Sequence, residues 1–278
     1  MSEVAEPQAV EFCPSAKLIK DPEPQKTEVI SVTDRSRDAF RGKGVFVTSL
    51  MKPGDVEKMR DAGIEWAALQ VIWQVRSRRR APRRTPTQCT VEARALLEAG
   101  IRTVLWGWPV PNRVEEFAQT MNRAADACGA EAIIINAELS DSEGPMWRHR
   151  DEDAADRMVE ALRGSDLPLA LVSHGYASPA LPWKALAKCD VGMPEAYDRT
   201  RKYPVKAGKA FVQRCMDAYA RHYDHVIPCL GLTQTPARTM RLLHGDLGDY
   251  EREGCVWWAW TGARNNRDKR RVLGEIEY

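Results

Sequence analysis

Residues 130–140 read AEAIIINAELS, a continuous apolar run that ends in polar residues. A short run of this kind, without strict alternation, is typical of a parallel strand that is buried on both faces. Further runs share this character, and a helix-like stretch follows each of them. In chain order the eight runs are GVFVTSL (44–50), IEWAALQVIWQ (64–74), IRTVLWGWP (101–109), AEAIIINAELS (130–140), LPLALVSHGY (167–176), CDVGMPEAYD (189–198), HVIPCLGLTQ (225–234) and CVWWAWTGAR (255–264).

The number of these runs indicates the fold. Amphipathic segments lie between them and can form an outer ring of helices, as at 114–128, 154–162, 207–222 and 236–243. Eight strand–helix repeats predict an α/β protein with a (β/α)8, or TIM, barrel that spans residues 43–278. Barrels of this kind place their chemistry at the carboxyl ends of the strands. The search for function therefore narrows to eight short stretches of chain.

Residues 1–42 differ in composition from the rest of the chain. They contain four prolines and many charges, and they show no sustained hydrophobic period. This composition predicts an extended N-terminal arm ahead of the barrel. One alternative is a disordered leader. Scattered apolar residues such as Val10 and Phe12 instead favour a segment that becomes ordered on its own barrel or on a protein partner.

The composition is that of a folded chain without a membrane segment. No apolar stretch approaches the roughly 18 to 20 residues that a membrane helix needs. The N-terminus, MSEVAEPQAVEF, is acidic where a secretory signal is basic and then apolar, so we expect no signal peptide and a cytoplasmic location at synthesis. The seven cysteines are an odd number without a CxxC pair, which favours reduced thiols. The net charge of +2 excludes neither anionic nor neutral ligands.

Motifs for metal, nucleotide or serine-nucleophile chemistry are missing from the sequence. It contains no HExxH, no GxSxG and no phosphate-binding GxxxxGK, and its five histidines are scattered. The sequence therefore predicts no metal and no cofactor. His174 ends the fifth run, where a ligand or a base could stand. Its alternative role is that of a polar residue whose partners lie within the fold.

Six of the nine residues at 76–84, in the loop after the second run, are arginines. The barrel places this loop on the face that carries chemistry. The planar fork of arginine suits phosphate, nucleic acid or an anionic wall polymer, although the loop lacks the aromatic residues that stack on nucleic-acid bases. The alternative is a solvated loop or a subunit contact. The candidate anion-binding residues are Arg76, Arg78, Arg79, Arg80, Arg83 and Arg84.

Two glutamates end apolar runs on the side that should face into the barrel. Counting by twos, Ile134, Asn136 and Glu138 share a face, so Glu138 stands at the barrel mouth if Ile134 points inward. The sixth run repeats the pattern with Glu195 and Tyr197. A charged residue at the end of an apolar run is typical of a functional site.

Two carboxyl groups across a barrel mouth can divide the roles of glycoside hydrolysis. We expect Glu138 to be the general acid, with Glu195 or Asp141 as nucleophile or base. A loop or helix-capping carboxylate is the alternative role for Asp141. The separation of the two groups decides the outcome, about 5 Å for retention and roughly 6.5 to 9.5 Å for inversion.

Aromatic and polar side chains that suit a sugar lie at the same strand ends. Sugar rings stack on indole rings, while amides, imidazoles and phenols hydrogen-bond sugar hydroxyls. A single tryptophan is more often part of a core than a binding platform, but their number at strand ends favours binding, first at Trp108 and Trp260. The candidate substrate-binding residues are Asn136, Tyr197, Asp198, Gln70, Trp73, Trp108, His174, Gln234, Trp258 and Trp260.

Three short patterns resemble known enzyme families. NAE at 136–138, MPEAYD at 193–198 and VWWAW at 256–260 are similar to the chitinase-type barrels of glycoside hydrolase family 18. The fourth run is also similar to that of the family 25 lysozymes, whose fourth strand ends in Asp-x-Glu. The resemblance implies a TIM barrel that acts on a cell-wall or other amino-sugar polysaccharide.

The resemblance also implies roles for single residues. Glu138 would be the general acid, and Tyr197 and Asp198 would support the N-acetyl group of the substrate or the reactive intermediate. The chain departs at Asn136, where both families have aspartate, and an amide cannot supply the negative charge that stabilises an oxazolinium.

Two hypotheses from different classes remain. The first is a glycoside hydrolase. The second is a catalytically inactive carbohydrate-binding or structural barrel in a larger assembly. Because we expect no signal peptide, a wall-directed hydrolase would act after lysis or travel in a particle such as a phage virion.

Overall fold

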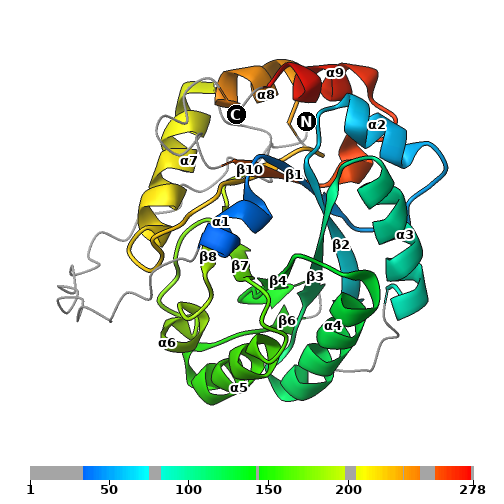
Figure 1. The fold of residues 1–278 in the computed structure, drawn as a ribbon. Helices are drawn as coiled ribbons and strands as arrows, with labels where there is room; N and C mark the ends of the chain where they lie inside the picture. Colours follow the sequence, from blue (N-terminus) through cyan, green and yellow to red (C-terminus); the bar gives the residue numbers. More distant parts are fainter. Residues whose placement is uncertain are drawn as a thin grey trace, which may run out of the picture.

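The computed structural model describes residues 34–74, 83–141, 144–197, 205–233, 235–244 and 254–276. Eight parallel strands close into a barrel, and each of them overlaps one of the expected runs (Figure 1). The predicted (β/α)8 fold is therefore confirmed. In barrel order the strands are β1 Lys43–Val47, β2 Trp66–Trp73, β3 Arg102–Trp108, β4 Ala132–Asn136, β7 Leu169–His174, β8 Val191–Glu195, β9 Cys229–Gly231 and β10 Cys255–Trp258.

Helices surround the barrel on its outside, except for α1, which covers one end of it (Figure 1). Their bounds are α1 Asp34–Phe40, α2 Asp55–Asp61, α3 Pro86–Glu98, α4 Val114–Cys128, α5 Glu152–Arg163, α6 Trp183–Leu186, α7 Val205–Tyr219, α8 Ala237–His244 and α9 Arg267–Glu275. Short 3-10 turns occupy Pro111–Arg113, His149–Asp151 and Trp260–Gly262, and a two-stranded sheet of β5 Ser140–Asp141 and β6 Gly144–Pro145 follows β4. Within the described ranges, no helix combines the length and apolar character that crossing a bilayer requires.

Local sequence signals account for the ends of these helices. Thr85 precedes α3, and its hydroxyl accepts a hydrogen bond from the Gln88 N–H while the Gln88 side chain accepts one from the Thr85 N–H. This reciprocal pair satisfies two backbone donors that a helix start leaves unpaired. Gly129 ends α4 in the left-handed conformation, which glycine adopts without steric cost.

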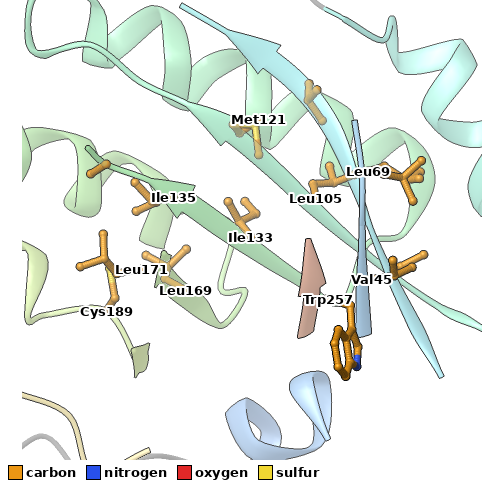
Figure 2. Close-up of a cluster of buried hydrophobic side chains, with 14 of the residues drawn as sticks. Val45, Leu69, Leu105, Met121, Ile133, Ile135, Leu169, Leu171, Cys189 and Trp257 are labelled. Atoms are coloured by element: carbon orange, nitrogen blue, oxygen red, sulfur yellow. The ribbon is translucent and has the colours of Figure 1, made fainter. Parts of the chain in front are cut away.

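Side chains of each strand alternate between two cores. On β4, Ile133 and Ile135 point toward the helices, whereas Ala132 and Ile134 face the barrel interior. Figure 2 shows the outer cluster, where Ile133 and Ile135 of β4 lie with Met121 of α4. Full burial of one such aliphatic side chain contributes about 1.5 to 3 kcal/mol. Because both faces are covered, the strands have the continuous apolar sequence from which they were predicted.

Helix α1 covers the amino-terminal end of the barrel. Figure 1 shows it in blue, in front of the strands. Phe40 is fully buried, and its ring meets Trp66 edge-on with 5.7 Å between the ring centroids. Residues 34–40 are thus a helix that packs into the interior cluster, which corrects the expectation of an extended arm for that part of 1–42. Residues 1–33 lie outside the described residues.

We expect Phe40→Ala to lower the free energy of unfolding by about 3 to 5 kcal/mol, because it removes a fully buried aromatic ring from the interior core. Denaturant unfolding measures this change. Leu97→Ala is the control: that side chain is 73% exposed on α3, so its loss should cost less than about 0.5 kcal/mol. A cost below 1 kcal/mol at Phe40 would show that α1 does not belong to the barrel core.

Candidate active site

Glu138 lies just past the carboxyl end of β4, on the inward side. Ile134 belongs to the interior cluster, and the period of two continues from it through Asn136 to Glu138. Glu138 is buried, with only 2% of the residue exposed to solvent. Its carbonyl oxygen accepts a hydrogen bond of 3.0 Å from the Trp147 N–H. The loop after β4 therefore holds this glutamate at the barrel mouth, as the sequence predicted.

Glu195 ends β8 and is 5% exposed. Its neighbour on the adjacent strand is His174, the last residue of β7. The backbone of Glu195 lies close to Gly175, where an added Cβ would stand 2.6 Å from the Glu195 carbonyl oxygen. Glycine at this position therefore allows the two strand ends to approach each other.

The structure brings Glu138, His174 and Glu195 together. Each offers one ligand atom, and these atoms all lie within 4.8 Å of one another. The expectation that both carboxyl groups face the same barrel mouth is confirmed. His174, for which the sequence left two roles open, is half-buried and accepts a hydrogen bond of 3.4 Å at Nε2 from the Leu139 N–H.

Tyr197 joins this group from the end of β8. Burial raises the pKa of its phenol, and so does the Glu195 carboxylate, to which the hydroxyl donates a hydrogen bond. The phenol therefore stays protonated and acts as a donor to Glu195. Gly231 makes room for it, because a Cβ there would lie 2.8 Å from the Tyr197 Cβ.

A polar layer crosses the barrel at the level of Glu195. In a TIM barrel, the inward side chains of alternate strands form one layer. The strand register places Gln70, Asn136 and Trp258 in the same layer as Glu195. Gln70 is 3% exposed and Asn136 is fully buried. Neither Oδ1 nor Nδ2 of Asn136 has a hydrogen-bond partner among the described residues. A buried polar group without a partner needs an explanation, such as a catalytic role or a water or ion that completes its hydrogen bonds.

An aromatic floor lies directly below that layer. The half-buried Trp258 ring contacts Phe46 and Trp106, with 5.1 Å and 5.2 Å between ring centroids. Cys229 completes the floor, and burial, followed by the charge of Glu195, raises the pKa of its thiol. The sequence analysis did not identify Phe46 and Cys229, although the period of two along their strands could have done so.

Trp73 and Trp108 form a stack at the rim of the barrel. Their rings lie 5.4 Å apart at 15°, and the Arg83 guanidinium lies 5.3 Å from the Trp73 ring. Because the register shifts between Gln70 and Ile72 in β2, Trp73 lies directly opposite Trp108 on the neighbouring strand. Both indoles are half-buried, and their role in sugar binding stays a prediction.

Other predicted residues do not line the mouth. Trp260 is fully buried in the outer core, which corrects its role as a sugar platform. Asp141 pairs with Gly144 through the backbone in the small sheet after β4, and its side chain lies outside the described part of the structure. Asp198 and Gln234 also lie outside the described residues.

Arg84 is part of the barrel framework, which corrects its predicted role in anion binding. The residue is 1% exposed and pairs with Glu92 at 2.7 Å. Its guanidinium also donates to the carbonyl oxygens of Gln70, at 2.7 Å, and Ser49, at 2.5 Å. It therefore ties the ends of β1 and β2 to α3. Arg76, Arg78, Arg79 and Arg80 lie outside the described residues.

Comparisons with known proteins identify the fold. No family model and no curated protein matches the chain. It is similar to a GH5-4 broad-specificity endoglucanase from an uncultured bacterium, with a TM-score of 0.62 and 9% identity over 89% of this chain and 97% of that one. It is also similar to a GH113 β-1,4-mannanase (TM-score 0.62, 12% identity, 85% and 98% covered). A xylanase and α-amylase inhibitor protein in complex with trehalose is similar too (TM-score 0.61, 9% identity, 85% and 99% covered).

These low identities establish the barrel fold and no more. The narrower resemblance to families 18 and 25 gains no support, since no family model matches. Function must therefore be argued from the site itself.

We expect Asn136→Leu to raise the free energy of unfolding by about 1 kcal/mol, because it replaces a buried amide without partners by an apolar group of similar shape. Thermal and urea unfolding measure the change. Asn266→Leu is the contrast, since the Asn266 side chain caps α9 and its loss should cost about 0.5 to 2 kcal/mol. A clear loss of stability at Asn136 would contradict the absence of partners there.

We expect Arg84→Met to lower the free energy of unfolding by about 3 to 5 kcal/mol, because it leaves the Glu92 carboxylate without its buried partner. Arg94→Met provides the control. The Arg94–Glu98 pair is exposed, with 81% and 73% of the two side chains accessible, so its loss should cost less than about 1 kcal/mol. Similar losses in the free energy of unfolding for the two variants would contradict the framework role of Arg84.

Proposed function

We propose that this protein is a retaining glycoside hydrolase with Glu138 as general acid and base and Glu195 as nucleophile. The observation that carries the proposal is the approach of the two carboxylates, whose ligand atoms lie within 4.8 Å. Retaining enzymes hold their two carboxyl groups about 5 Å apart, whereas inverting enzymes need about 6.5 Å or more to admit a water molecule. The geometry therefore favours the retaining reaction.

The reaction proceeds in two balanced steps. The Glu195 carboxylate attacks the anomeric carbon while Glu138 transfers its proton to the glycosidic oxygen, so that one C–O bond breaks and a glycosyl ester forms. In the second step the Glu138 carboxylate takes a proton from water. The water oxygen bonds to the anomeric carbon, and Glu195 leaves as a carboxylate.

Neighbouring residues support these roles. The Tyr197 hydroxyl donates a hydrogen bond to Glu195, which orients the carboxylate and moderates its charge. Trp258 is half-buried beside the pair and offers an indole to a sugar ring. Gln70 and Asn136 supply amides that can hydrogen-bond sugar hydroxyls.

The comparisons are consistent with this proposal through fold alone. Two of the similar structures are named as an endoglucanase and a mannanase. A further one is a glycoside hydrolase family 5 enzyme from Prevotella bryantii in complex with a xyloglucan oligosaccharide (TM-score 0.60, 10% identity). For this chain we propose a cell-wall or other amino-sugar polysaccharide as substrate, following the resemblance of MPEAYD at 193–198. Mannan and xyloglucan belong in the same assay.

A second candidate is a carbohydrate-binding barrel without catalysis. Asn136 favours it, because an amide stands where the chitinase-type and lysozyme barrels have aspartate. The similarity to an inhibitor protein in complex with trehalose is consistent with it. The two candidates differ in one measurable property, the release of new reducing ends.

The test is to incubate the purified chain with peptidoglycan, chitin, mannan, xyloglucan and glucan and to measure reducing ends. We expect Glu138→Gln and Glu195→Gln each to lower the rate by about 10²-fold to 10⁴-fold, because each removes a group that transfers a proton or attacks carbon. Azide should restore turnover of Glu195→Gln and give a glycosyl azide of inverted configuration.

Glu98→Gln is the matched control, since that carboxylate is exposed on α3 and lies outside the site. It should cleave at the wild-type rate. Equal, slow cleavage of all glycans by the wild type and both site variants would overturn the hydrolase, and glycan binding without cleavage would favour the second candidate.

A further inference from the structure

The same three groups have the chemistry of a metal site. Glu138 and Glu195 offer carboxylate oxygens and His174 offers an imidazole nitrogen, all within 4.8 Å of one another. Three ligands of this kind on rigid strand ends can hold a divalent transition ion and leave coordination positions open. The sequence predicted no metal, because the ligands come from three separate runs without a spacing motif.

Charge gives a physical reason for a cation at this place. The two carboxylates are 2% and 5% exposed, so water screens their mutual repulsion poorly. A positive charge between them relieves that repulsion.

Asn136 is a second and independent indication. It is fully buried, lies on the inward face of β4 two residues before Glu138, and belongs to the layer of Glu195. Both polar atoms of its amide lack partners in the described part of the chain. A buried amide without partners is rare in a folded core. Its oxygen can bind a cation directly or accept a hydrogen bond from a water on that cation.

We propose that Glu138, His174 and Glu195 bind one divalent transition-metal ion, with Asn136 facing the open coordination positions. The imidazole nitrogen favours ions such as Zn²⁺ and Co²⁺ over Mg²⁺ and Ca²⁺, which prefer sites built of oxygen atoms alone. Tyr197 would hold the Glu195 ligand in place from outside.

This inference goes beyond the proposed hydrolase and does not rest on it. A bound ion occupies the carboxylate lone pairs that proton transfer and nucleophilic attack require. The two-carboxylate reaction is therefore blocked only while the ion is bound, and a chelator should preserve or raise any glycosidase rate.

The experiment is a titration of the full chain, after treatment with a chelator, with Co²⁺ and Zn²⁺. Co²⁺ reports its ligands through visible absorption, and calorimetry measures the Zn²⁺ stoichiometry and affinity. We expect one ion per chain and no displacement by equimolar Mg²⁺. The variants Glu138→Gln, His174→Gln and Glu195→Gln should each weaken binding by at least about 10-fold.

Two further variants make the test specific. His222→Gln is the control, since that imidazole stacks on Trp183 at 4.3 Å and is not a member of the ligand group. It should bind as the wild type does. Asn136→Leu should weaken binding while its fold, checked by circular dichroism, is retained.

The outcomes separate the metal site from the hydrolase. Failure of the wild type to bind Co²⁺ or Zn²⁺ overturns the metal site, whatever the variants do. Wild-type affinity in a folded His174→Gln variant, or loss of binding in His222→Gln, also overturns it. Glycan cleavage is measured separately in chelator, so either proposal can fail while the other stands.

Discussion

Two almost fully buried carboxylates approach within 4.8 Å at the mouth of the barrel, and the features of the site follow from the need to accommodate their charge. Tyr197 donates a hydrogen bond to Glu195, and a ligand atom of His174 lies within 4.8 Å of both carboxylates. Buried like charges are unfavourable unless protons, donors or cations compensate them. This requirement leads to both proposals, because a shared proton suits glycoside hydrolysis and a bound cation suits a metal site.

The barrel can hold this arrangement because its framework is stabilised elsewhere. At the amino-terminal end, Phe40 of α1 packs on Trp66. At the carboxyl end, Arg84 pairs with Glu92, and a second buried pair joins Arg264 to Asp55 at 2.8 Å. Both arginines also donate to carbonyl oxygens of the loop that follows β1. These contacts hold the strand ends in place, so the functional side chains need not stabilise the fold themselves.

The site also illustrates why fold and function are separate questions here. Similar barrels include an endoglucanase, a mannanase and an inhibitor protein, at 9% to 12% identity. One architecture therefore supports hydrolysis in some proteins and inhibition in another. For this chain, the polar layer of Gln70, Asn136 and Glu195 over an aromatic floor carries more information about function than the barrel does.

The apolar runs of the sequence were enough to predict the barrel and the inward and outward faces of its strands. Runs such as AEAIIINAELS predict strands buried on both sides, and the period of two from Ile134 correctly turned Glu138 inward. These features are local, because a pleated strand imposes them on consecutive residues.

Which side chains meet at the site could be learned from the closed barrel and not from the sequence. His174 and Glu195 come from neighbouring strands and reach Glu138 through the barrel register, which no motif records. The burial of Arg84 and Trp260 also depends on residues elsewhere in the fold. For that reason the prediction from sequence wrongly placed both side chains among the binding residues. The physical reason is that burial and separation are properties of the closed barrel, whereas periodicity is a property of each strand.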